Sequence, residues 1–317
     1  MSEQAILPAP WSERVWRLRL GIAPRDALGR PGPIGGLGLH SESVPKPWLV
    51  PPGPPEVLDP GIGLPGIPQS PSGRFAVKYE RDHVDAPGAP KPLVVRIVDR
   101  HRAYVARRFS IPVPKLETVQ DADAAHAADP ASPLTPRAFR PVLFPGSAYG
   151  TAAGATVVRG RVVWESNDRP AAWARVAART ADEIEIRDDN GDVIATLQPL
   201  LGRAHGDEKG EFVLVVGPVP SGLGLGIEMK LRTLDLSVRV QVRPEPPVTD
   251  PVESPTGSRD DPLWHLPVED VASLSPTDPV ATGDTVPAGY TAGVTKNVTC
   301  RLGTATRPAV TFVVPGP

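Results

Sequence analysis

The sequence predicts an all-β fold in which two tandem β-sandwiches are joined by proline-rich linkers and followed by an extended tail. With 317 residues, the chain is long enough for two ordinary domains and their connections. Its 42 prolines and 30 glycines disfavour helix interiors and are tolerated at turns and sheet edges. Short segments alternate apolar and polar residues with a period of two, the pattern of strands that bury one face. The order of these segments recurs in the second half of the chain, which indicates two copies of one unit.

Period-two alternation marks strand candidates along both halves of the chain. In the first half they are residues 16–20, 75–79, 93–98 and 108–113. In the second half they are residues 157–164, 173–178, 183–187, 193–197, 212–216, 225–231 and 236–242. Asn190 and Gly191 predict a hairpin turn between two of these segments, because a type I′ turn needs two positive φ angles. Residues 121–129 favour a short surface helix, which Pro130 ends.

Six elements of the two sets correspond in order, at an offset of about 140 residues. The correspondences are 17–20 with 159–162, 26–31 with 167–170, 35–39 with 172–176, 72–75 with 209–212, 93–97 with 225–229, and 107–113 with 237–243. Because the order of elements is preserved, the sequence predicts a divergent internal duplication. Phe75 and Phe212 occupy equivalent Gly-x-Phe positions, so we expect both rings to plug the core between two sheets.

The second copy carries three motifs in a fixed order. It opens with a Val-x-Gly-x-Val strand at 158–162, continues through a polar turn that ends in Pro170, and later has Asp207 followed by Gly-x-Phe at 210–212. These motifs resemble the carboxypeptidase regulatory-like (transthyretin-like) domain. The resemblance implies a sandwich of about seven strands, an Ig-like arrangement that serves as an accessory or structural module and has no catalytic residues of its own.

The resemblance covers residues 155–243 well and residues 14–113 more loosely. Two features depart from the family pattern, a longer hairpin at 183–197 and a proline-rich insertion at 43–71. The predicted organisation is an extended N-terminus (1–13), a first sandwich (14–113), a linker (114–153), a second sandwich (154–243) and an extended tail with terminal strands (244–317).

The tail is rich in Pro, Asp, Ser and Thr, a composition typical of segments that wrap over a partner or over their own domain. Residues 295–300 and 309–314 alternate again. They predict a terminal hairpin, or a strand that adds to a sheet edge in another chain.

No arrangement of residues predicts catalysis, so we expect a non-enzymatic protein without metal or cofactor. The six histidines show no metal-ligand spacing. His83, with Asp82 and Asp85 beside it, is interpreted as part of an exposed hairpin tip rather than as a metal loop. The acidic loop 188–192 lacks the length and the terminal glutamate of a calcium loop, so a solvated turn is favoured. The single cysteine, Cys300, excludes an internal disulfide and is interpreted as a strand residue.

Arginine and aromatic residues are interleaved between residues 96 and 109, and they are the best candidate for a charged binding face. The candidate interaction surface consists of Arg96, Arg100, Arg102, Tyr104, Arg107 and Arg108, with Trp264 as an isolated apolar anchor in the tail. One interpretation is an anion- or nucleic-acid-binding face. We favour the other, an outward strand face paired with acidic residues of a neighbouring strand or subunit, because the formal net charge is −2.

The sequence therefore predicts a non-catalytic structural or assembly protein whose partners are other protein subunits, not nucleic acid or membrane. Tandem sandwiches of this composition are similar to accessory components of phage-tail-like or contractile injection particles, an analogy at the level of fold. The alternative is a ligand- or carbohydrate-binding module that uses loop tips and Trp48 or Trp264. The acidic N-terminus with its early prolines, and the absence of a long apolar segment, favour the cytoplasm or carriage in a larger particle.

Overall fold

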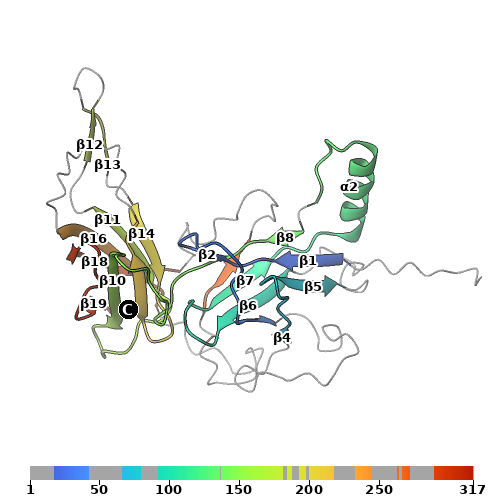
Figure 1. Cartoon of the computed structure of the whole chain (residues 1–317). Helices are drawn as coiled ribbons and strands as arrows, with labels where there is room; N and C mark the ends of the chain where they lie inside the picture. Colours follow the sequence, from blue (N-terminus) through green and yellow to red (C-terminus); the bar gives the residue numbers. More distant parts are fainter. Residues whose placement is uncertain are drawn as a thin grey trace, which may run out of the picture.

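The computed structural model describes residues 18–42, 66–79, 92–135, 137–180, 184–187, 193–197, 200–217, 233–244, 263, 266–271 and 289–316 (Figure 1). Within these residues the protein is all-β, as predicted, with several sheets and one helix. Two of the apolar clusters are sandwich cores, and each lies between a three-stranded sheet and a larger one. The described strands therefore build two β-sandwiches.

The first sandwich pairs a three-stranded sheet with a five-stranded one. Its strands are β1 (Leu18–Ile22), β3 (Leu37–Ser41), β4 (Gly66–Ile67), β5 (Phe75–Tyr79), β6 (Leu93–Asp99), β7 (Arg107–Ile111), β8 (Ala138–Phe139) and β17 (Val268–Asp270). The sheets have the orders β5-β1-β8 and β17-β7-β6-β3-β4. Phe139 of β8 packs edge-to-face on Phe109 of β7, with ring centroids 5.1 Å apart, and so joins the two sheets across the core.

The second sandwich pairs a three-stranded sheet with a four-stranded one. Its strands are β10 (Val157–Trp164), β11 (Arg175–Thr180), β14 (Leu200–His205), β15 (Glu211–Val215), β16 (Thr233–Val242), β18 (Ala292–Arg301) and β19 (Val310–Val314). The sheets have the orders β15-β10-β19 and β14-β11-β16-β18. Alternate residues of β16, from Leu236 to Val242, are fully buried in the core, as the period-two pattern requires.

The two sandwiches have the same strand topology. In each, the first strand pairs antiparallel on one side and parallel on the other: β1 with β5 and β8, and β10 with β15 and β19. The larger sheets correspond as β4-β3-β6-β7 and β14-β11-β16-β18, and every one of these pairs is antiparallel. The repeat seen in the sequence is therefore also a repeat of sheet topology.

This topology corrects the last two correspondences that we drew from the sequence. β6 matches β16, because each lies beside the equivalent central strand, β3 or β11. The counterpart of β7 is then β18 rather than residues 237–243. Residues 225–231, which the sequence matched to β6, lie outside the described residues. The error arose because strand pairing, and not a constant offset in the chain, defines equivalence.

Segments assigned to a linker and a tail also supply strands to the sandwiches. The range 114–153 contains β8, the parallel partner of β1, and β9 (Val142–Leu143), which pairs with β2 (Arg25–Asp26). The range 244–317 contains β17, β18 and β19, so these strands complete sheets of their own chain rather than of another. β8 has two residues and is too short to show a period, which explains why the sequence did not reveal it.

The two Gly-x-Phe motifs do what the sequence predicts. Gly73 and Gly210 have φ angles of 74° and 70°, in the left-handed region that favours glycine. Phe75 and Phe212, two residues further on, are each 1% exposed. Gly160 lies directly opposite Phe212 across the sheet, and a Cβ there would collide with the Phe212 ring and come within 2.9 Å of the Val310 carbonyl oxygen. A glycine at this position is therefore required for the ring to lie over the strand.

Two local predictions are also confirmed. α2 (Leu116–Ala128) includes most of the alanine-rich segment and ends before Pro130. β12 (Ile184–Arg187) and β13 (Val193–Leu197) pair antiparallel and project from the second sandwich (Figure 1). Their connection, 188–192, lies outside the described residues, as do 43–65, Asp82 and His83. Among the described helices, none is long and apolar enough to cross a membrane.

Candidate functional site at the junction of the sandwiches

The arginines of the candidate interaction surface are largely buried, which corrects the expectation of an exposed face. Arg96 and Arg107 are 0% exposed and are the largest fully buried side chains of the described residues. Arg100 is exposed, and Trp264 lies outside the described residues. Charged side chains are rarely fully buried unless they are paired, so the acidic partners of these arginines define what the region does.

Glu42 supplies the partner for two of them. It follows β3 directly, and its carboxylate accepts hydrogen bonds from the Arg96 guanidinium and from Nε and Nη2 of Arg108, the latter at 2.8 and 2.6 Å. Arg96 and Arg108 are directly opposite each other on β6 and β7. The acidic residue therefore comes from the same sheet, and the pairing holds the strands of the first sandwich together.

A second carboxylate, that of Glu269, connects the two sandwiches. Glu269 lies on β17 and receives two hydrogen bonds from Arg107 of β7, one of them from Nε at 2.9 Å. It also receives one at 3.1 Å from Nη2 of Arg175, which begins β11 of the second sandwich. All three side chains are at most 8% exposed. One buried anion thus sits between cations of two different sandwiches.

Burial and pairing act in opposite directions on Arg107. Loss of water lowers the pKa of its guanidinium, while the charge of Glu269 and the hydrogen bonds to it raise that pKa. Removing one partner of a buried ion pair leaves an uncompensated charge, which is strongly destabilising. Glu269 is therefore the residue on which the charge balance of the junction depends.

His205 and Phe144 form an aromatic contact beside this pair. His205 is directly opposite Arg175 on the neighbouring strand β14, and its ring stacks on Phe144 with centroids 3.8 Å apart. Desolvation, together with the positive charges of Arg175 and Arg107, holds the pKa of the His205 imidazole well below its usual 6.5. Its buried Nδ1 has no hydrogen-bond partner among the described residues. The imidazole is therefore neutral at physiological pH.

A separate apolar cluster also connects the two sandwiches. It consists of Val105, Trp173, Leu263 and Leu266, with Val98, Ala106 and Ala172 against it. Trp173 has a φ of 61°, which is costly for a bulky residue. Its backbone is held by a hydrogen bond from the Tyr290 hydroxyl at 2.7 Å and by one to the Asp207 carbonyl at 3.1 Å. The cluster joins β-sheet loops of both sandwiches to the segment that precedes β17.

Arg102 makes a further ionic contact between the sandwiches. Its Nη2 donates to the carboxylates of Asp207 and Glu208 at 2.7 and 3.2 Å. Asp207 also accepts hydrogen bonds from two backbone amides of the turn before β15, so its position is fixed. Arg102 is more than a third exposed, and solvent screens this pair. The ion pair therefore contributes more to the relative orientation of the two sandwiches than to the stability of the protein.

Tyr104 is held inside the first unit rather than presented for binding. Its hydroxyl and that of Tyr149 both donate to the Asp26 carboxylate at 2.7 Å. Desolvation and these hydrogen bonds raise the pKa of both tyrosines. The two rings pack edge-to-face at 5.6 Å, which anchors the connecting segment to the first sandwich.

Sequence reasoning found the arginines but not their partners. Glu42, Glu269 and Asp207 come from segments distant in the chain, and Arg175 and His205 come from the other sandwich. A pattern of neighbouring residues does not indicate contacts between segments that are distant in the chain. Among the described residues, no group of three or more His, Cys, Asp or Glu side chains is placed to hold a metal ion.

Comparison with known proteins gives no family. No protein-family model matches the sequence, and no curated protein matches it either. Among solved structures, the shaft pilin SpaA from Lactobacillus rhamnosus GG is similar at 8% identity over 96% of this chain and 98% of that chain, with a TM-score of 0.22. A streptococcal ancillary pilin is similar at 9% identity over 100% of this chain and 68% of that chain, with a TM-score of 0.21.

A 9R-lipoxygenase from Cyanothece PCC8801 is similar at 14% identity over 31% of this chain, with a TM-score of 0.19, and this chain spans only 13% of its length. TM-scores this low do not imply a common overall fold for any of these proteins. The function must therefore be inferred from the geometry of the chain itself.

Proposed function

We propose that the chain is a non-catalytic structural protein that holds two β-sandwiches in a fixed arrangement as a subunit of a larger protein assembly. The observation that carries this proposal is the course of the C-terminal part of the chain. It adds β17 to the first sandwich and then supplies β18 and β19 to the second. One region of the sequence thus provides strands to both units.

The contacts at the junction support the same role. Glu269 lies on β17 and binds cations of both sandwiches, while the Trp173 cluster and the Arg102 pair connect them elsewhere. Flexibly linked domains usually meet through polar interfaces and move relative to each other. Here the interface contains the buried charges of Arg107, Glu269 and Arg175 and a separate apolar cluster, an arrangement suited to keeping the two sandwiches at a fixed distance.

The prediction of a phage-tail-like or contractile injection particle rests on analogy of fold and stays a prediction. We propose the carboxypeptidase regulatory-like family for both sandwiches, on the motifs that the second copy carries at 158–162, Pro170 and 207–212. The feature to compare with members of that family is the strand order of the three-stranded sheets, β5-β1-β8 and β15-β10-β19.

Purification of the native material tests the assembly role directly. We expect the chain to sediment with other subunits in particles larger than a single copy, with a regular outline in negative-stain images. The recombinant chain alone serves as the control for self-association. Native material that sediments as the free chain at all concentrations, with no associated tubes, sheaths or other subunits, would contradict the proposal.

A further inference from the structure

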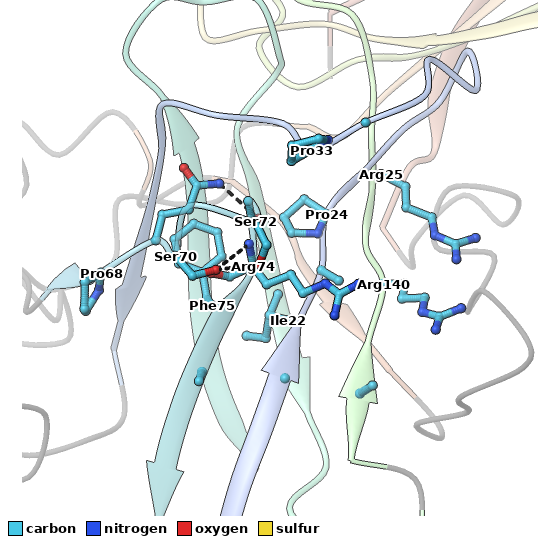
Figure 2. Close-up of a pocket in the computed structure, with 17 residues that line it drawn as sticks. Ile22, Pro24, Arg25, Pro33, Pro68, Ser70, Ser72, Arg74, Phe75 and Arg140 are labelled. Atoms are coloured by element: carbon cyan, nitrogen blue, oxygen red, sulfur yellow. Dashed lines mark hydrogen bonds between the residues drawn. The ribbon is translucent and has the colours of Figure 1, made fainter.

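A cavity of about 940 Å³ opens on the first sandwich, away from the junction (Figure 2). This volume lies within the range of small-molecule sites in proteins, roughly 300–1,000 Å³. Three arginines line it, Arg25, Arg74 and Arg140, and none of them contributes to the core or to the junction network. The cavity is therefore a feature that the structural role does not explain.

The floor of the cavity is a row of small residues across the three-stranded sheet. Gly21 of β1 is directly opposite Ala76 of β5 on one side and Ala138 of β8 on the other. All three line the cavity, together with Ile22 and Phe75 of the same sheet. Large side chains in this row would fill the space, so the small residues are what leaves the sheet accessible.

One wall is a rigid turn that carries Arg74. Ser70 and Arg74 close the turn through hydrogen bonds of 2.8 Å from the Ser70 amide and 2.9 Å from the Ser70 hydroxyl, both to the Arg74 carbonyl. Gly73 has a φ of 74°, and a Cβ there would lie 2.6 Å from Cβ of Pro33. Gln69 donates from its side chain to the Gly73 carbonyl at 3.0 Å. Arg74 and the Ser72 hydroxyl are thus presented from a fixed backbone.

The opposite wall carries the other two arginines. Arg25 lies on β2, whose parallel partner β9 begins at Val142, and its amide donates to the Pro141 carbonyl at 2.8 Å. Arg140 immediately precedes Pro141, so Arg25 and Arg140 belong to adjacent backbone segments. Figure 2 shows the Arg74 side chain extending from the turn toward the side where Arg25 and Arg140 lie. Among the described residues, none of the three guanidinium groups forms an ion pair.

From this geometry we propose that the cavity binds a small ligand that carries a phosphate or sulfate group. Guanidinium groups match the oxygens of tetrahedral oxyanions and bind them through paired, charge-assisted hydrogen bonds. All three arginines line the same cavity, so an oxyanion bound there would be attracted by their positive charges. The chain as a whole carries a formal net charge of −2, so anion binding must come from this local group of charges. The small-residue floor leaves space for the uncharged part of the ligand.

Titration calorimetry of the full chain with glucose 6-phosphate, glucose 6-sulfate and glucose tests this assignment. We expect the phosphate ester, the sulfate ester or both to bind, glucose not to bind, and affinity to fall as salt is added. The double substitution Arg74→Gln with Arg140→Gln should weaken binding by at least about tenfold. Arg161→Gln is the matched control, because Arg161 is exposed on β10 of the other sandwich and should leave affinity unchanged.

The affinities measured for glucose 6-phosphate and glucose 6-sulfate identify the oxyanion that the cavity prefers. Arg74 is exposed and Arg140 half-buried, and circular dichroism of the double variant checks that the fold is retained. No binding of either ester at millimolar concentration would overturn the proposal. Equal loss of affinity in the Arg161 control would also overturn it, because the interaction would then be non-specific. Either outcome leaves the proposed structural role of the junction untouched.

Discussion

The guanidinium of Arg107 forms a two-point ion pair with the carboxylate of Glu269, although 162 residues separate them in the sequence. Arg175 of the second sandwich binds the same carboxylate. A single acidic residue on the three-residue strand β17 therefore forms ion pairs with two buried cations from different sandwiches. This arrangement explains why a short strand, far along the chain from its neighbours, occupies a defined place beside β7.

Replacing Glu269 by Gln should destabilise the protein by about 3–5 kcal/mol, because Arg107 and Arg175 would lose the buried carboxylate that they share. Urea denaturation followed by tryptophan fluorescence measures the change. Asp270→Asn is the control, since Asp270 is exposed on the same strand and should change the free energy of unfolding by no more than about 0.5 kcal/mol. Equal effects of the two substitutions would refute the assigned role of Glu269.

Acidification should destabilise the protein through His205. Its folded-state pKa lies well below 6.5, so below that pH the unfolded chain binds a proton that the folded chain does not. The stability that this group contributes is present above pH 6.5 and is lost as the pH falls, by up to about 1.4 kcal/mol per pH unit.

The substitution His205→Phe isolates this contribution, because a phenyl ring can keep the stacking on Phe144 and cannot take a proton. Free energies of unfolding measured at a series of pH values should fall less steeply for the variant than for the parent chain. Parallel curves for the two proteins would show that His205 does not titrate as its burial requires.

Replacing Gly210 by Ala should cost about 1–3 kcal/mol, because the residue has a φ of 70° and its Cβ would meet the Val162 carbonyl oxygen. Thermal unfolding monitored by circular dichroism reports the loss. Gly150→Ala provides the comparison, since no atom lies within 4 Å of a Cβ at that position. A neutral Gly210 variant would mean that the turn before β15 can relax.

The Cys300 thiol should react slowly in the folded protein. Burial, with a further contribution from Asp235, raises the pKa of this thiol, so little reactive thiolate is present at mildly alkaline pH. A chromogenic disulfide reagent should label it only in denaturant. The combined substitution Cys300→Ser with Thr295→Cys moves the thiol to an exposed position of the same strand, where native-state labelling should be fast. Rapid labelling of the parent chain would contradict the buried position in β18.

The parts of the fold that the sequence predicted are those encoded locally. Phe75 and Phe212 follow glycines whose turn geometry needs positive φ, and period-two alternation identifies strands such as β10 and β16. Cys300 is buried and lies in strand β18, as the valine, threonine and leucine around it predicted. Each of these features is decided within a few residues, so a single sequence suffices to find it.

The rest depended on contacts between distant segments. Two-residue strands such as β8 have no period, and the assignment of β18 to the second sandwich requires its pairing with β16. A run of arginines such as Arg96 and Arg107 is typical of an exposed surface, whereas both are buried and paired with Glu42 and Glu269, which come from elsewhere in the chain. For this reason the sequence identified Arg102 and Arg107 of the junction, but it placed them on an exposed face and did not reveal Glu269 or Arg175.

Differential scanning calorimetry of the full chain tests most directly whether the two sandwiches form one structural unit through β17 and the junction. We expect a single unfolding transition whose calorimetric enthalpy equals its van't Hoff enthalpy, and a separation into two transitions in the Glu269→Gln variant. Two independent transitions in the parent chain, unchanged by that substitution, would contradict it.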